Sequence, residues 1–94
     1  MTILVDDAVW PWRDHLWAHL VSDESYAELH VFADLLGIPR KAFQGDHYDI
    51  HADLRVKAIE LGAQPIGGKE LVARLRAAEL RRPNPHSPGT PAPG

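Results

Sequence analysis

Glycine and proline breaks divide residues 2–82 into runs whose hydrophobic spacing alternates between that of a strand and that of a helix. Residues 24–36 form the clearest helical run, because apolar side chains recur there at helical spacing until Gly37 ends it. Two further helices are predicted at 51–61 and 69–82, and strands are predicted at 2–6, 15–21, 38–44 and 63–66. This order is typical of a small α/β domain whose mainly parallel sheet, of three to four strands, is flanked by three helices.

The run at residues 15–21 fits both a strand and a helix. On a strand His15 and His19 share a face, and on a helix they are four residues apart and again share a face. We expect a strand, because the Ser22-Asp23 pair that follows would make a good helix N-cap. In either case the two histidines are predicted to be neighbours.

Composition limits the chain to one domain, predicted at residues 1–82, without disulfides or thiolate chemistry, since its 94 residues include no cysteine. Residues 83–94 contain five of the eight prolines and are expected to form a flexible tail. No apolar run approaches the length of about 18 residues that a membrane span needs. The start of the chain lacks the basic segment of a secretory signal, so we expect a cytoplasmic protein.

Charge is unevenly distributed along the chain. The net charge of -3 argues against a nucleic-acid binder. Residues 1–70 carry 12 acidic and 6 basic side chains, whereas residues 71–94 carry four arginines and one glutamate. The acidic part suits a metal ion and the basic end suits an acidic partner, although a solvated helix end would also explain the arginines. The sequence identifies neither a small-molecule or protein partner nor the oligomeric state.

Polar side chains gather in two stretches that each follow a predicted strand. Asp6 and Asp7 come after the apolar run Ile3-Leu4-Val5, which we expect at the centre of the sheet. His47, Tyr48 and Asp49 come after the strand predicted at 38–44. Because ligands bind where parallel strands end, we expect His47, Asp49 and Asp6 to converge on one pocket, with His19 as its fourth member.

Imidazole and carboxylate groups of this kind suit a divalent metal ion such as zinc, manganese, iron or nickel. In a metal-dependent phosphodiesterase or nuclease, the carboxylates would hold cations, His47 would act as general base and Arg55 would hold a phosphate. The candidates are His47, Asp49 and Asp6 as catalytic residues, Tyr48, Arg55 and Trp12 as ligand-binding residues, and His19, His15 and Asp7 as metal ligands. The zincin pattern His-Glu-x-x-His is absent, because position 16 is leucine.

Three other interpretations remain open. A metal-free acid–base pocket needs only His47, Tyr48 and Asp49, although their spacing is not expected to place Asp49 on His47. Asp49 is equally suited to capping the second helix, and the histidines could make ordinary hydrogen bonds. The third interpretation is a non-enzymatic interaction module in which Trp10, Trp12, Trp17 and the basic third helix bind a partner protein. Trp10 and Trp12 belong to a loop predicted at 8–14, where Pro11 is unfavourable for a central strand.

Several short phrases, in their order and spacing, resemble one family of small bacterial and phage proteins, the domain of unknown function 4031 family. The resemblance covers about residues 1–80. It rests on Val5-Asp6-Asp7, Leu16-Trp17-Ala18-His19-Leu20, Glu28-Leu29-His30-Val31-Phe32-Ala33, Phe43-Gln44, His47-Tyr48-Asp49 and Leu61-Gly62-Ala63. The family carries no assigned activity, so the resemblance implies a shared pattern and supplies no mechanism.

Overall fold

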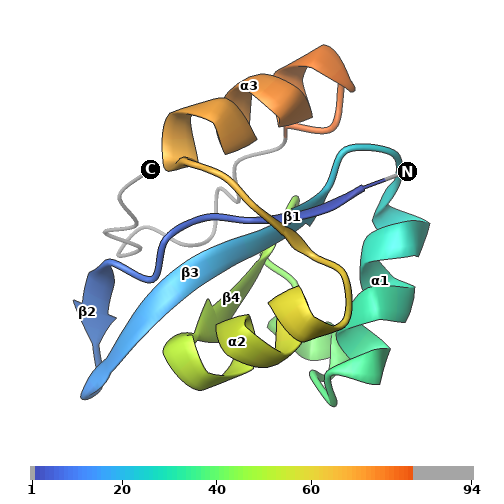
Figure 1. Ribbon diagram of the computed structural model, residues 1–94. Coiled ribbons are helices and arrows are strands. Elements are labelled where there is room, and N and C mark those ends of the chain that lie inside the picture. Colours follow the sequence, from blue (N-terminus) through green and yellow to red (C-terminus); the bar gives the residue numbers. More distant parts are fainter. Residues whose placement is uncertain (1, 82–94) are drawn as a thin grey trace.

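A computed structural model describes residues 2–81, which form three α-helices and one five-stranded sheet (Figure 1). The tail predicted at 83–94 lies outside the described residues. Helix α3 lies on one side of the sheet, and helices α1 and α2 lie on the other (Figure 1). Within residues 2–81, no helix has the length and apolar character needed to cross a membrane.

Strand β3 (His15–Ser22) is the centre of the sheet. Strand β1 (Ile3–Val5) pairs antiparallel with the end of β3, and strand β2 (Trp10–Trp12) pairs antiparallel with its beginning. The prediction of a strand over 15–21 is therefore confirmed. Strand β1 is internal as expected, because it has β3 on one edge and β5 on the other.

The prediction of a mainly parallel sheet is wrong. Strand β4 (Tyr48–His51) pairs antiparallel with the free edge of β3, and among the described strands only β5 (Gln64–Pro65) runs parallel to its neighbour, β1. The reason lies in the connections. Strands β2 and β3 are joined by a two-residue turn at Arg13 and Asp14, whose φ angles of 50° and 65° give the turn geometry that returns a strand antiparallel.

Two segments differ from the sequence prediction. The strand predicted at 38–44 is absent from the described structure, and a short 3₁₀ helix, Arg40–Ala42, follows Pro39 instead. The strand lies later, at β4, where buried Tyr48 and Ile50 alternate with partly exposed neighbours in the two-residue period of a strand. The loop predicted at 8–14 contains β2, an edge strand in which Pro11 is tolerated.

The three predicted helices are confirmed, at α1 (Tyr26–Leu35), α2 (Ala52–Glu60) and α3 (Gly68–Ala77). The predicted cap at Ser22-Asp23 is wrong, because β3 continues through Ser22. The hydroxyl of Ser25 caps α1 by accepting the backbone N–H of Glu28 at 3.0 Å.

The two faces of the sheet have different partners. One face packs against α1 and α2 and forms the larger apolar core, to which the sheet contributes Ile3, Val5, Ala18, Leu20, Tyr48 and Ile50. On the second face only Leu4 and Val21 join an apolar cluster, which they form with Leu71 and Leu75 of α3. Because side chains alternate along a strand, the rest of this second face carries the polar and aromatic residues of β2, β3 and β4.

Candidate metal centre

Three potential metal ligands converge on the second face of the sheet. His19 of β3 and Asp49 of β4 are direct cross-strand partners, so their side chains stand side by side. His47 precedes β4, and its imidazole meets that of His19 edge to face, with ring centroids 5.0 Å apart. One nitrogen or oxygen atom from each of the three residues lies within 4.8 Å of the others, so the three residues form a group that could hold a metal ion.

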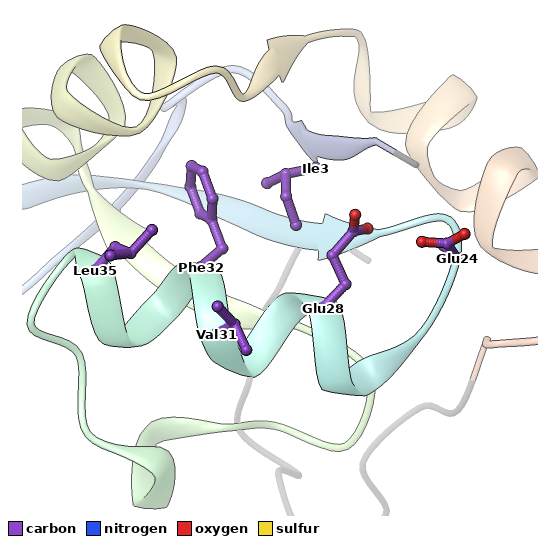
Figure 2. Close-up of a pocket in the computed structure, with 6 residues that line it drawn as sticks. All are labelled: Ile3, Glu24, Glu28, Val31, Phe32 and Leu35. Atoms are coloured by element: carbon purple, nitrogen blue, oxygen red, sulfur yellow. The ribbon is translucent and has the colours of Figure 1, made fainter.

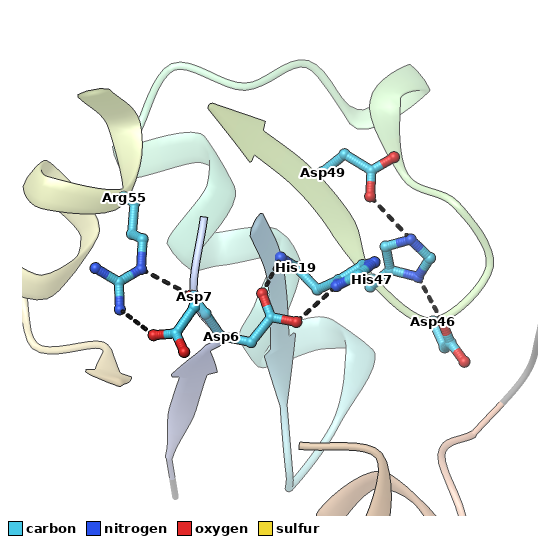
Figure 3. Close-up of polar contacts among 7 residues, drawn as sticks. All are labelled: Asp6, Asp7, His19, Asp46, His47, Asp49 and Arg55. Atoms are coloured by element: carbon cyan, nitrogen blue, oxygen red, sulfur yellow. Dashed lines mark hydrogen bonds and ion pairs between the residues drawn. The ribbon is translucent and has the colours of Figure 1, made fainter. Parts of the chain in front are cut away.

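Both imidazoles are held at Nδ1 by a buried carboxylate (Figure 3). The Nδ1 atom of His19 lies 2.7 Å from Oδ2 of Asp6, whose other oxygen accepts the His19 backbone N–H at 2.6 Å. The Nδ1 atom of His47 lies 2.7 Å from Oδ1 of Asp46. A carboxylate on Nδ1 orients the ring and leaves Nε2 for a metal ion, which is the usual arrangement of metal-binding histidines.

Two buried polar atoms in this group have no hydrogen-bond partner among residues 2–81. Nε2 of His47 and Oδ1 of Asp49 are 3.0 Å apart, yet they are not aligned as a hydrogen bond, and neither has a hydrogen-bond partner within residues 2–81. Buried polar atoms without partners are costly, and an ion or ordered water is a common reason for them. Two imidazoles and one carboxylate are also a donor set that metal sites with open coordination positions use, so these residues fit a metal ion.

The surroundings of His47 are strongly negative. Burial acts to lower its pKa, but the adjacent carboxylates of Asp46 and Asp49 outweigh burial and raise the pKa to about 9. Figure 3 shows His47 between these two aspartates. Asp46 also binds the Arg81 guanidinium at 2.7 Å, which connects the chain beyond α3 to the loop that carries His47. The negative electrostatic potential of Asp46 and Asp49, which favours a protonated imidazole, also favours a bound cation.

The structure brings together the four residues expected to converge, since Asp6 contacts His19 while His47 contacts both His19 and Asp49. Two expectations about Asp49 are wrong. Its carboxylate lies 3.0 Å from Nε2 of His47 despite the two-residue spacing. It also does not cap α2, because the N-cap position is His51.

The other predicted site residues lie elsewhere. The Tyr48 side chain points into the core on the opposite face, where its hydroxyl lies 2.8 Å from Nδ1 of His30. His15 is not a neighbour of His19, because four residues along a strand span about 13 Å. The Asp7 side chain is mostly exposed, and half of Trp12 is exposed at the hairpin end.

Arg55 of α2 contacts the chain next to the site through Asp6 and Asp7. Its Nε donates to the backbone oxygen of Asp6 at 2.7 Å, and its guanidinium lies 3.6 Å from the Asp7 carboxylate (Figure 3). These contacts hold the chain just beyond β1 and so position the Asp6 carboxylate.

Asp46 is the residue that sequence reasoning overlooked. It is 1% exposed, and it holds His47. The available signal was its place beside His47 after Gly45, where the chain turns with φ of 90°.

A separate groove of about 390 Å³ runs along α1, on the core side of the sheet (Figure 2). Four apolar and two acidic side chains line it, namely Ile3, Val31, Phe32, Leu35, Glu24 and Glu28. It contains no imidazole, and the sheet separates it from the His–Asp group.

Fold and site together define a small mixed α/β domain with two histidines and one carboxylate gathered on the less covered face of its sheet. The chain belongs to the family described as protein of unknown function (DUF4031), whose pattern matches residues 3–78. The resemblance seen in the sequence is thereby confirmed, and the matched segment contains the whole His–Asp group. No curated protein and no solved structure matches the chain.

Proposed function

We propose that this protein binds one divalent transition-metal ion, zinc foremost, and uses it to hydrolyse a phosphate ester. The proposed ligands are Nε2 of His19, Nε2 of His47 and Oδ1 of Asp49. The observation that carries the proposal is the buried pair of His47 Nε2 and Asp49 Oδ1, which face each other 3.0 Å apart without an aligned hydrogen bond, adjacent to the His19 ring.

The donor set favours zinc but also accepts iron(II) or manganese. Zinc hydrolases commonly use three nitrogen or oxygen ligands and keep a fourth position open, whereas iron(II) sites often use two histidines and one carboxylate. Thiolate-selective metals are disfavoured, because the chain has no cysteine.

The roles of the chain's own residues follow from their contacts. Asp6 and Asp46 orient the imidazoles, and Arg55 fixes the backbone of Asp6. The partly exposed carboxylate of Asp49 can accept a proton from an attacking water through its second oxygen. When bound, the ion supplies Lewis acidity toward the phosphate. Arg55 is therefore assigned to positioning, since its nearest oxygens belong to Asp6 and Asp7.

The first test is metal binding by the chelator-treated protein, measured by calorimetry with zinc and by the visible absorption of added cobalt(II). We expect one equivalent to bind, and we expect His47→Ala to weaken binding at least about 100-fold, since it removes a ligand. His15→Ala is the matched control, because His15 lies on the same strand face outside the group. Hydrolysis of a chromogenic phosphodiester should follow metal loading. Equal zinc affinity in wild type and His47→Ala would contradict the proposed site.

The alternative of a protein-interaction module has less support. Trp10 is buried, and two arginines at the basic end of the chain are paired internally, Arg74 with Asp23 and Arg81 with Asp46. Trp10 and these two arginines are therefore engaged within the chain.

A further inference from the structure

All three tryptophans of the chain lie on the same face as the His–Asp group. Trp10 is buried and packs against the His19 ring, with centroids 4.6 Å apart. Trp17 follows on β3, and Trp12 lies 5.5 Å from it between ring centroids. A continuous row of rings therefore extends from the proposed metal ligands to the end of the β2–β3 hairpin.

Two imidazoles widen this row on its other side. His15 and His51 stack with centroids 5.2 Å apart, and Trp17 stands edge-on to both. Nδ1 of His51 is buried and has no hydrogen-bond partner in the described part of the chain. The Trp17 indole is fixed in orientation, because its N–H donates to the backbone oxygen of Trp12 at 2.7 Å.

The Arg13 side chain adds a positive charge to these aromatic rings. The Arg13 guanidinium lies 4.7 Å from the centre of the Trp12 ring, which is 49% exposed. Arg13 occupies a backbone conformation with φ of 50° that side-chain-bearing residues seldom adopt. The turn thus holds a positive charge beside the exposed indole. We call these five residues, Trp12, Arg13, His15, Trp17 and His51, the aromatic surface.

We propose that the aromatic surface binds the planar base of a nucleotide whose phosphate lies at the His–Asp group. This inference rests on the proposed function, since it names the class of phosphate ester. Aromatic side chains on an open sheet face are a common platform for stacked bases. Along β3, Trp17 is two residues from His19, about 7 Å, which is comparable to the distance between a base and its own phosphate.

The polar members of the surface favour a base over an apolar ligand. The Arg13 guanidinium offers hydrogen bonds that the edge of a base can accept, whereas an apolar ligand has no acceptor for them. The net charge of -3 disfavours a long polynucleotide, whose binding depends on many phosphate contacts. A mononucleotide or a short oligonucleotide needs few phosphate contacts.

The experiment uses the tryptophans as reporters, because three indole N–H signals can be followed by NMR. The probes are adenosine monophosphate, adenosine and a short single-stranded oligonucleotide, with inorganic phosphate as a control. We expect the signals of Trp12 and Trp17 to shift with each base-containing probe and not with phosphate. If the oligonucleotide binds more tightly than adenosine monophosphate, the ligand is a single-stranded nucleic acid. If the two bind equally, the ligand is a mononucleotide.

Two variants test the location. Trp12→Leu should weaken adenosine monophosphate binding about tenfold, which is about 1.4 kcal/mol, because it removes one stacking partner of the base. Leu35→Ala, in the groove on the other side of the sheet, should leave it unchanged.

Failure of this inference and failure of the proposed function give different results. Adenosine has no phosphate, so its binding to chelator-treated protein tests the aromatic surface alone. If adenosine shifts the indole signals but no metal binds, the proposed function fails and the aromatic surface stands. If zinc binds but no base-containing probe moves the indole signals, the aromatic surface is not a nucleotide site and this inference is overturned.

Discussion

Asp6 and Asp46 illustrate how a carboxylate can act on a site without facing its ligand. Each is buried and contacts Nδ1 of a histidine, so each fixes the orientation of the ring and leaves Nε2 for a ligand. Asp46 has the further contact with Arg81, which offsets part of its charge. The two histidines are thereby constrained before any ligand arrives, and that preorganisation lowers the entropic cost of binding.

The pKa of His47 gives a pH prediction for chelator-treated protein. Its folded-state pKa of about 9 lies above the ordinary value of 6.5, so its charged form stabilises the fold. That contribution is fully present below pH 6.5 and is lost as pH rises through 9. The melting temperature, followed by circular dichroism, should fall by several degrees over this interval. His47→Gln should show a shallower fall, and parallel curves for the two proteins would contradict the assignment.

At the level of elements, the β2–β3 hairpin depends on an unusual turn. Both central residues have positive φ, a conformation that favours glycine or asparagine, and Asp14 has φ of 65°. Asp14→Gly should remove the strain and raise the free energy of unfolding by roughly 0.5–1 kcal/mol in urea denaturation. Leu16→Gly, on the strand beside the turn, is the contrasting control and should destabilise. A destabilised Asp14→Gly protein would show that the Asp14 side chain supports the turn.

The same hairpin explains how far the sequence could predict the fold. The three helices follow from periodicity, and the internal strand β1 follows from its apolar run. The strand at 15–21 does not follow from periodicity, because its spacing also fits a helix, and the Ser22-Asp23 pair that favours a strand is not the cap of α1. The antiparallel direction does not follow either, since Arg13-Asp14 lacks the usual turn residues. Strand β4 was missed because its four residues run directly into α2, so a two-residue period was hidden by the helical one.

The site was more predictable than the topology around it. Asp6, His19, His47 and Asp49 were expected at one edge of a parallel sheet, and they do lie together. They meet, however, because β1 and β4 flank β3, which places Asp6 and Asp49 on either side of His19. The place of Asp46 beside His47 is visible in the sequence, whereas its contact with Arg81, 35 residues away, could not be predicted.

Across the whole molecule, the proposed ligands tie together segments that are distant in sequence. His19 lies on the central strand, whereas His47 and Asp49 belong to the loop and edge strand that follow α1. Arg81 then joins the end of the described chain to the same loop. An ion bound here would cross-link the central strand to the edge strand, on the part of the second face that lies outside the apolar cluster formed with α3.

Zinc should therefore stabilise the entire domain and not only a loop. At a free zinc concentration about 100 times the Kd, linkage gives about 2.7 kcal/mol, which corresponds to a rise of roughly 10–20 °C in melting temperature for a domain of this size. Differential scanning calorimetry with and without zinc measures this rise, and His15→Ala should retain it. His47→Ala should lose most of it, because two ligands hold the ion more weakly than three. A rise of the same size in His47→Ala would place the zinc elsewhere on the chain.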